Sequence, residues 1–97
     1  MNKEQALKIL RKNRAVLTDT YGVRRIGLFG SIVKDQLKPE SDIDIVVEIE
    51  TEKKKLHNFL SLRRYLEEQL GRPVDLGLES ALKPVIRDEV LMETAYV

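Results

Sequence analysis

The sequence predicts an α/β fold in a single domain spanning residues 1–97. Three observations predict it. Apolar runs rich in Ile and Val alternate with segments of helical periodicity, glycine or proline falls between them, and the length suits one domain. Hydrophobic residues make up 42% of the chain and charged residues 34%, a balance typical of a globular protein with a core.

The N-terminal segment has the pattern of a helix. Asn2 and Gln5 have the spacing of a capping box, and apolar residues then recur at helical intervals. Gly22 stands where a helix commonly ends. We therefore expect one helix over about residues 3–21 and a short strand over residues 23–29.

A glycine-opened turn follows this strand. Gly30 and Ser31 interrupt the apolar run, and a helical turn is expected over residues 32–36. Residues 37–41 form a loop. Residues 42–49 are rich in Ile and Val and too few for a typical helix, so they are expected to form a largely buried strand.

The second half of the chain continues the alternation. A charged connector leads into an amphipathic helix, and Pro84 has the position of a first helical residue. The expected elements are, in order, a helix from about Leu56 to Gly71, a strand over Val74–Leu78, a helix over about Val85–Met92 and a short edge strand over Thr94–Val97.

Composition excludes several classes of protein. The net charge is +1, from 17 basic and 16 acidic residues, so nothing signals a nucleic-acid partner. The absence of cysteine excludes disulfide and thiolate chemistry. No apolar run approaches the ~18 residues of a membrane span, and the N-terminus lacks an apolar signal core. We expect a cytoplasmic protein that does not bind a membrane.

Three acidic residues lie on predicted strands. Asp42 and Asp44 are two residues apart, so a strand points both to the same face, about 6.6 Å apart along the chain. Asp75 interrupts the apolar strand of residues 74–78 and joins them if the two strands pair. Two such charges ~5 Å apart repel by roughly 3 kcal/mol at an effective dielectric of 20, and a divalent cation removes that repulsion.

Two interpretations of these acids follow. Hard carboxylate oxygens without cysteine favour Mg²⁺ or Mn²⁺ over Zn²⁺, with Asp42, Asp44 and Asp75 as metal ligands. The alternative is structural: Asp42 ends a strand, and the other two lie on a solvated face of the sheet.

Gly30 and Ser31 are candidate phosphate-binding residues, because a turn of this kind offers backbone N–H groups to an anion. The alternative is an ordinary turn between a strand and a helix. Lys34, three residues after Ser31, is within reach of phosphates bound there, or is simply a solvated lysine. The motifs of P-loop enzymes, dinucleotide-binding folds and serine hydrolases are absent, and His57 is expected on a helix surface.

The combined motif resembles the signature of the DNA polymerase β-type nucleotidyltransferase superfamily. It consists of Leu28-Phe29-Gly30-Ser31, a ten-residue spacer, and Asp42-Ile43-Asp44 followed by an apolar run, with the apolar-Asp-apolar strand at Asp75. At this length the chain resembles the minimal nucleotidyltransferases, which are often encoded beside a helical HEPN-domain ribonuclease. The resemblance implies a mixed sheet of about four strands flanked by helices.

The resemblance also implies a function. Asp42, Asp44 and Asp75 would hold two Mg²⁺ ions, and the turn at Gly30 and Ser31 would bind the triphosphate. A nucleoside monophosphate, AMP from ATP, would move to an acceptor hydroxyl, which in several members is a tyrosine of the HEPN toxin. The chain would then act as the antitoxin, in a homo- or hetero-oligomer.

One position departs from that pattern and supports a different function. Members often carry Arg and Gly at the third and fourth positions after the serine, where this chain has Lys34 and Asp35. Lysine lacks the bidentate fork of arginine, and Asp35 adds a negative charge near the phosphates. The alternative is therefore a weakly active or inactive module that neutralises a partner by contact. An antibiotic-modifying enzyme is less favoured, because such enzymes usually have a further domain.

Overall fold

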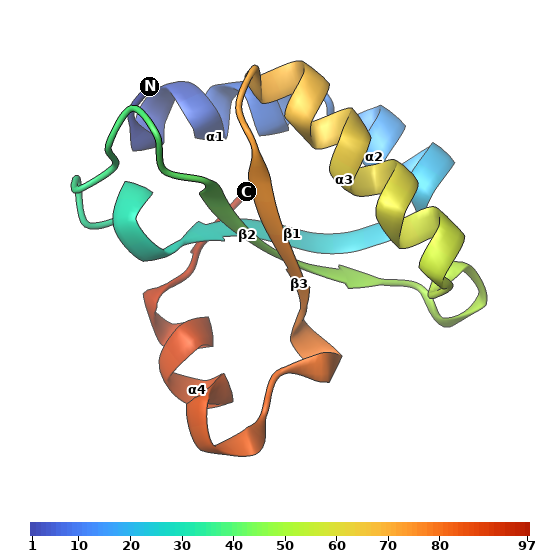
Figure 1. Ribbon diagram of the computed structural model, residues 1–97. Coiled ribbons are helices and arrows are strands. Elements are labelled where there is room, and N and C mark those ends of the chain that lie inside the picture. Colours follow the sequence, from blue (N-terminus) through green and yellow to red (C-terminus); the bar gives the residue numbers. More distant parts are fainter.

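Four strands form one mixed sheet in the computed structural model, which describes all of residues 1–97 (Figure 1). They are β1 (Val23–Phe29), β2 (Ile43–Ile49), β3 (Val74–Leu78) and β4 (Ala95–Tyr96), and their order across the sheet is β3-β2-β1-β4. β1 is antiparallel to β2 and β4, whereas β2 and β3 are parallel. The mixed sheet of about four strands that the family resemblance implies is confirmed.

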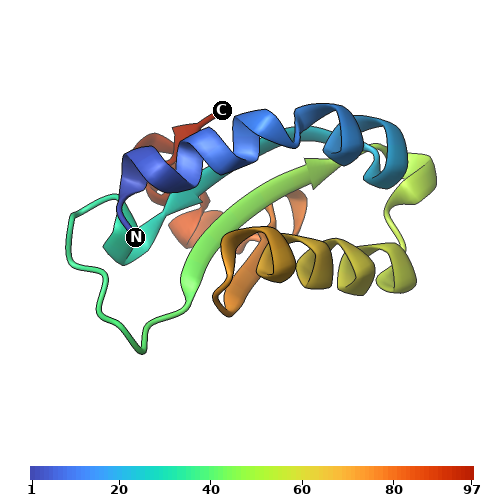
Figure 2. The ribbon, with the colours of Figure 1, turned by 90° about the horizontal axis from the view of Figure 1, so that it is seen from above.

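Helices cover one face of the sheet much more fully than the other. α1 (Lys3–Lys12), α2 (Arg14–Tyr21) and α3 (Leu56–Leu70) pack over one face, and α4 (Pro84–Glu93) lies on the opposite side (Figure 1). Seen from above, α1 and α2 run along one side of β2 and α3 along the other (Figure 2). No helix is long and apolar enough to span a membrane.

The hydrophobic core lies between the sheet and α1, α2 and α3. Alternate residues of β2 point into it, because successive side chains of a strand face opposite ways. Leu10, Leu17, Leu62 and Leu66 meet them from the helices and are almost completely buried. The residues of β2 in this core are Ile43, Ile45, Val47 and Ile49. The intervening Asp44, Val46 and Glu48 are therefore left for the other face.

The prediction of one helix over residues 3–21 was wrong, since the helix breaks at Asn13. The capping box at Asn2 and Gln5 is present as expected. The side chain of Asn13 donates from Nδ2 to the carbonyl oxygen of Ile9 at 2.8 Å and accepts from the hydroxyl of Tyr65 at 2.5 Å. A side chain that bonds nearby backbone competes with the helix, and this one also fixes the break to α3.

Most other predicted boundaries are confirmed within two residues, including β1, α3, β3, α4 and the edge strand β4. His57 is exposed on α3, as expected. The helical turn after the first strand begins earlier than predicted, as a 3₁₀ turn over Gly30–Ile32. The buried strand starts at Ile43 rather than Asp42, which leaves Asp42 at the end of the preceding loop.

Candidate active site

Two of the predicted acidic residues lie side by side on the face of the sheet opposite α1, α2 and α3. Asp44 is in register with Phe29 at the end of β1 and with Asp75 on β3. Asp42 immediately precedes β2, two residues from Asp44. The expected pairing of the Asp75 strand with the Asp42–Ile49 segment is confirmed, and it gathers the three carboxylates at one end of the sheet.

The Gly30 turn lies directly against Asp44. Gly30 has φ of +74°, a left-handed conformation that favours glycine, and a Cβ atom there would stand 2.2 Å from Oδ2 of Asp44. The backbone N–H of Ser31 donates to the carboxylate of Asp44. Both the backbone angle and the close approach explain why this position holds glycine, and together they join the turn and the acids into one site.

The electrostatics of Asp44 are unfavourable in the absence of a cation. Burial, then the neighbouring carboxylates of Asp75 and Asp42, raise the pKa of Asp44, while the N–H of Ser31 acts in the opposite direction. A carboxylate with a raised pKa lowers the stability of the fold at pH values where it is ionised. A bound cation reverses this effect, because it stabilises the charged form of every carboxylate around it.

The chemistry of the donors fits a hard divalent cation. The three carboxylates are oxygen ligands, and their mutual repulsion is what a cation would relieve. No three acidic or histidine side chains converge on one point as a complete set of metal ligands. Mg²⁺ commonly takes only one or two protein carboxylates and completes its coordination with water and substrate phosphates, so an open arrangement suits it.

Arg72 holds the loop that leads to Asp42, a role that sequence reasoning missed. Its Nη2 atom donates to three backbone carbonyl oxygens, those of Lys38 at 2.6 Å, Ser41 at 2.9 Å and Pro39 at 3.1 Å. These carbonyls belong to an irregular segment without strand partners, so the guanidinium supplies hydrogen bonds to them, and the carbonyl oxygen of Lys38 also accepts from the N–H of Ser41. Nothing in the sequence around Arg72 signals this contact, which joins residues more than thirty positions apart.

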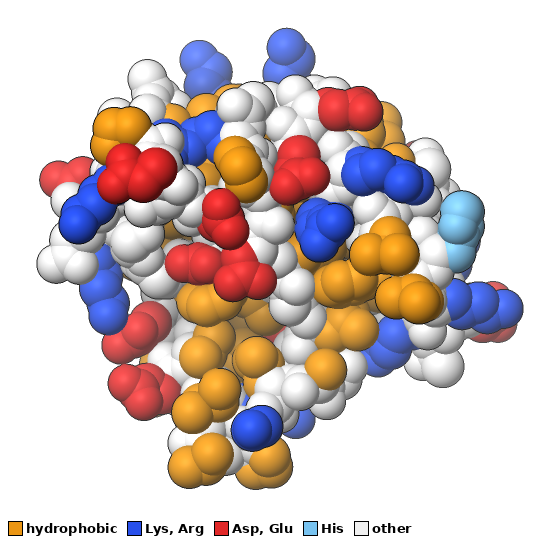
Figure 3. Space-filling view, in the orientation of Figure 1, with side chains coloured by type: hydrophobic (Ala, Val, Ile, Leu, Met, Phe, Trp, Pro, Cys, Tyr) orange, Lys and Arg blue, Asp and Glu red, His pale blue; other side chains and the backbone are white.

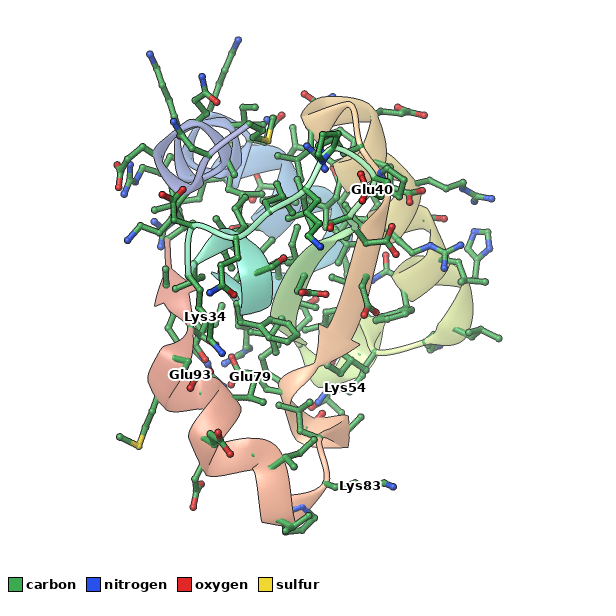
Figure 4. The ribbon with its side chains drawn as sticks, turned by 60° about the vertical axis from the view of Figure 1, so that its left-hand side comes forward. Lys34, Glu40, Lys54, Glu79, Lys83 and Glu93 are labelled. Carbon is green, nitrogen blue, oxygen red and sulfur yellow. The ribbon has the colours of Figure 1, made fainter.

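A buried carboxylate further along the same face also went unpredicted. Glu79 is only 3% exposed and lies near the sheet in Figure 4. It accepts from Nε of Arg25 at 3.2 Å and from the hydroxyl of Tyr96 at 3.0 Å. Glu79 thus ties β1 and β4 to the segment after β3, and the hydrogen bonds compensate the loss of hydration on burial.

A second ion pair lies close by. Glu48 of β2 pairs with Lys54 at 2.5 Å and accepts from the backbone N–H of Ser80 at 3.1 Å. Burial opposes ionisation of Glu48, but the hydrogen bonds with Lys54 and Ser80 together lower its pKa. Glu48 lies near the C-terminal end of β2, whereas Asp42 and Asp44 are at its N-terminal end.

Lys34 is exposed and points toward α4 rather than into the acidic cluster (Figure 4). Its Nζ lies 4.0 Å from Oε2 of Glu93. Asp35, which follows it, has φ of +57°, the same left-handed region as Gly30. Aspartate tolerates this conformation better than most residues, so the turn keeps a backbone shape that glycine adopts without strain.

The space-filling view gives the surface of this site (Figure 3). Acidic side chains gather left of centre, with hydrophobic side chains below them and others to the right, toward the N-terminal end of α3. The site is therefore an acidic patch bordered by apolar surface.

Comparisons with known proteins identify the family of the chain. The nucleotidyltransferase domain family matches residues 4–97. The chain is 44% identical over 94 residues to the protein adenylyltransferase MntA of Thermococcus cleftensis, covering 97% of this chain and 94% of that protein. It is 38% identical over 92 residues to a protein of Methanocaldococcus jannaschii assigned as a protein adenylyltransferase, covering 93% and 92% of the two chains.

Solved structures of similar fold indicate the same family. A structure assigned as a minimal nucleotidyltransferase superimposes with a TM-score of 0.82 at 32% identity, covering 98% of this chain and 95% of the other. A toxin-antitoxin structure with AMP-PNP superimposes with a TM-score of 0.68 at 25% identity, covering 99% of this chain and 72% of that one. The motif, the fold and these matches together show that the chain belongs to the nucleotidyltransferase domain family, among the minimal nucleotidyltransferases of the polymerase β type.

Proposed function

We propose that this protein transfers AMP from ATP, with Mg²⁺, to a hydroxyl of a partner protein. The partner proposed is a HEPN toxin, the hydroxyl is that of a tyrosine, and the transfer neutralises the toxin. The single observation that carries the proposal is the packing of the Gly30 turn against Asp44, in register with Asp75. A phosphate-binding turn and a pair of carboxylates in contact are what metal-assisted phosphoryl chemistry needs.

Each residue has a role in the proposed reaction. The backbone at Gly30 and Ser31 binds the triphosphate. The side chain of Lys34 turns away from Glu93 and pairs with the negative charge of the triphosphate. Asp42, Asp44 and Asp75 would hold Mg²⁺, which supplies charge stabilisation at the α-phosphate and the leaving group. Mn²⁺ is a chemically similar substitute.

Asp75 orients the acceptor hydroxyl and receives its proton. The acceptor oxygen bonds to the α-phosphorus, the bond from that phosphorus to the bridging oxygen breaks, and pyrophosphate leaves with the electron pair. The acceptor thus becomes an AMP ester, and Asp75 is regenerated once the proton passes to solvent.

The relatives support the adenylyl and antitoxin parts of the proposal. The relative from Thermococcus cleftensis is named a protein adenylyltransferase, and the AMP-PNP structure is of a toxin-antitoxin.

The test uses ATP labelled at the α-phosphate. The purified protein, with Mg²⁺, is incubated in lysate of its source organism, and a parallel reaction uses γ-labelled ATP. The proposal predicts α-label on a protein band that is lost with Asp42→Asn and Asp44→Asn. Label from the γ position alone, retained in both variants, would identify a kinase in the lysate and contradict the proposal.

The second candidate is a module that neutralises its partner by contact alone. The observation that favours it is Asp35, a negative side chain on a strained turn next to the proposed phosphate site. Under this alternative, Asp44→Asn still protects cells from the toxin. Loss of protection by Asp44→Asn in a complex that still forms would exclude it.

A further inference from the structure

β3 is the outermost strand on the side of the sheet that carries the site. It pairs with β2 alone, and it is only five residues long. An edge strand presents backbone N–H and C=O groups to any extended chain that lies alongside it. β3 also carries Asp75, the residue to which the proposed reaction gives the acceptor proton. The open edge is therefore next to the chemistry.

An apolar pocket lies beside this edge. It has a volume of about 350 Å³ and lies between β3 and the first turn of α3. Leu76 and Leu78 form its wall on the strand, and Leu56 and Phe59 form its wall on the helix. Leu56 is 73% exposed, so its side chain is accessible to a partner at the mouth of this pocket. The exposed Lys55 supplies positive charge at the rim, whereas the neighbouring Lys54 is already paired with Glu48.

Gly77 leaves the sheet bare between Asp75 and Glu79. A Cβ atom added at Gly77 would meet nothing within 4 Å, whereas one at Gly27 would stand 2.4 Å from Thr94. Packing of the C-terminal segment thus explains Gly27 but not Gly77. Glycine inside a strand weakens it relative to alanine and often marks the close approach of another chain.

We propose that an extended segment of the acceptor protein adds to the outer edge of β3 and presents its hydroxyl to Asp75. This inference rests on the proposed function. A residue paired with Asp75 points to the same face, with its Cβ about 4.5–5.5 Å from that of Asp75. The next residue points to the other face, toward the pocket.

The geometry sets the chemistry of the segment. It carries a hydroxyl residue next to a large apolar residue, which enters the pocket between Leu56 and Leu78. A carboxylate flanking these two residues meets Lys55. The side chain two positions from the hydroxyl passes over Gly77, where there is room for it.

The test is an NMR titration of the whole 97-residue protein, labelled with ¹⁵N, in the absence of nucleotide. The probe is an acidic hexapeptide with Tyr-Leu at its centre, and the control peptide has Tyr-Ser. The proposal predicts amide shifts confined to residues 74–78 and 55–59, and at least tenfold weaker binding of the control peptide. Shifts elsewhere, or equal affinity for the two peptides, would overturn it.

Two variants of the same helix give a matched comparison. Leu56→Glu removes the exposed wall of the pocket and repels the acidic probe, and the fold tolerates it because a carboxylate is favourable in the first turn of a helix. We expect at least a tenfold loss of affinity. Leu60→Glu, at a residue 37% exposed one turn further and outside the pocket, is expected to change affinity less than twofold. Equal losses would contradict the proposed docking site.

Gly77→Val tests independently whether the partner passes over the uncovered surface of the sheet at Gly77. Valine suits a strand and has open space here, so the melting temperature is expected to hold or rise while peptide affinity falls. Unchanged affinity in Gly77→Val would count against the proposal. Shifts of the β3 amides that depend on protein concentration without peptide would identify a second copy of this chain as the occupant, and would also overturn it.

Experiments can contradict the docking proposal and the proposed function independently of each other. Peptide binding that responds to Leu56→Glu, with no α-label on any acceptor, supports docking and counts against AMP transfer. Transfer to an acceptor that is equally efficient in Leu56→Glu and the parent protein supports the function and refutes docking at this edge.

Discussion

The two faces of the sheet are built from the same strands but in opposite ways. On one face, Ile45 and its neighbours are completely buried under α1, α2 and α3. On the other, Asp44 lies among carboxylates that raise its pKa, beside a turn with a left-handed glycine. The comparison teaches that one face of β2 contributes stability, while the other holds an arrangement of like charges that is unfavourable by itself.

The largest expected effect is on the site face. Asp44→Asn is expected to lower AMP transfer about a thousandfold, within the range for loss of one preorganised electrostatic group. Its fold should remain intact, because the helix-covered face is untouched. The measurement is incorporation of α-label, with circular dichroism as the control for folding. Full activity in a folded Asp44→Asn protein would contradict the assignment of the site.

Substitutions on the opposite face of the sheet should lower the stability of the fold rather than AMP transfer. Ile45→Ala removes a fully buried side chain and is expected to cost about 2–5 kcal/mol of unfolding free energy. Urea denaturation measures it. Val90→Ala on α4, which is only partly buried, is the matched control and should cost less. Similar losses of unfolding free energy at the two positions would mean that the packing of α4 stabilises the fold as much as the main core does.

The turn beside the acids should be sensitive to side chains at its two left-handed residues. Gly30→Ala is expected to lose about 1–2 kcal/mol from backbone strain, with more from the clash against Asp44, and to impair ATP binding. Asp35→Gly is the reciprocal change: it relieves strain, removes a negative charge near the phosphates and should strengthen ATP binding. Calorimetric ATP affinity for the two variants tests this, and weaker binding in Asp35→Gly would refute it.

A smaller effect is expected at high pH. Burial and then the hydrogen bond to Glu79 raise the pKa of Tyr96 to about 12, from 10.0. Between pH 10 and 12 the unfolded chain loses this proton and the folded protein keeps it, so the stabilisation present below pH 10 is lost as the pH rises toward 12. Urea titrations across this range should show a steeper loss in the parent protein than in Tyr96→Phe. Identical slopes would contradict the role of the Tyr96 hydroxyl.

The parts of the fold that could be predicted are those that depend on the local pattern of the sequence. Apolar alternation placed β2, and Gly22 and Gly71 placed the ends of α2 and α3. The same pattern put Asp44 and Asp75 on one face once the strands paired. Such signals depend on residues close in sequence, and they determined most element boundaries.

The features missed depend on distant contacts. The break at Asn13 is fixed by Tyr65, fifty-two residues away, and the burial of Glu79 depends on Arg25 and Tyr96. No periodicity encodes such a contact, because each polar residue could equally have been solvated. Lys34 was placed near the phosphates by its spacing alone, and that position remains a prediction.

The most direct test of the contrast between the two faces is a thermal melt of the parent protein and Asp44→Asn at neutral pH. Each is measured without metal and then with Mg²⁺ and a non-hydrolysable ATP analogue. We predict that Asp44→Asn melts a few degrees higher than the parent without metal, because like-charge repulsion is removed, and that only the parent is stabilised substantially on adding Mg²⁺ and analogue. A lower melting temperature for Asp44→Asn without metal, or equal stabilisation of both proteins, would contradict the account.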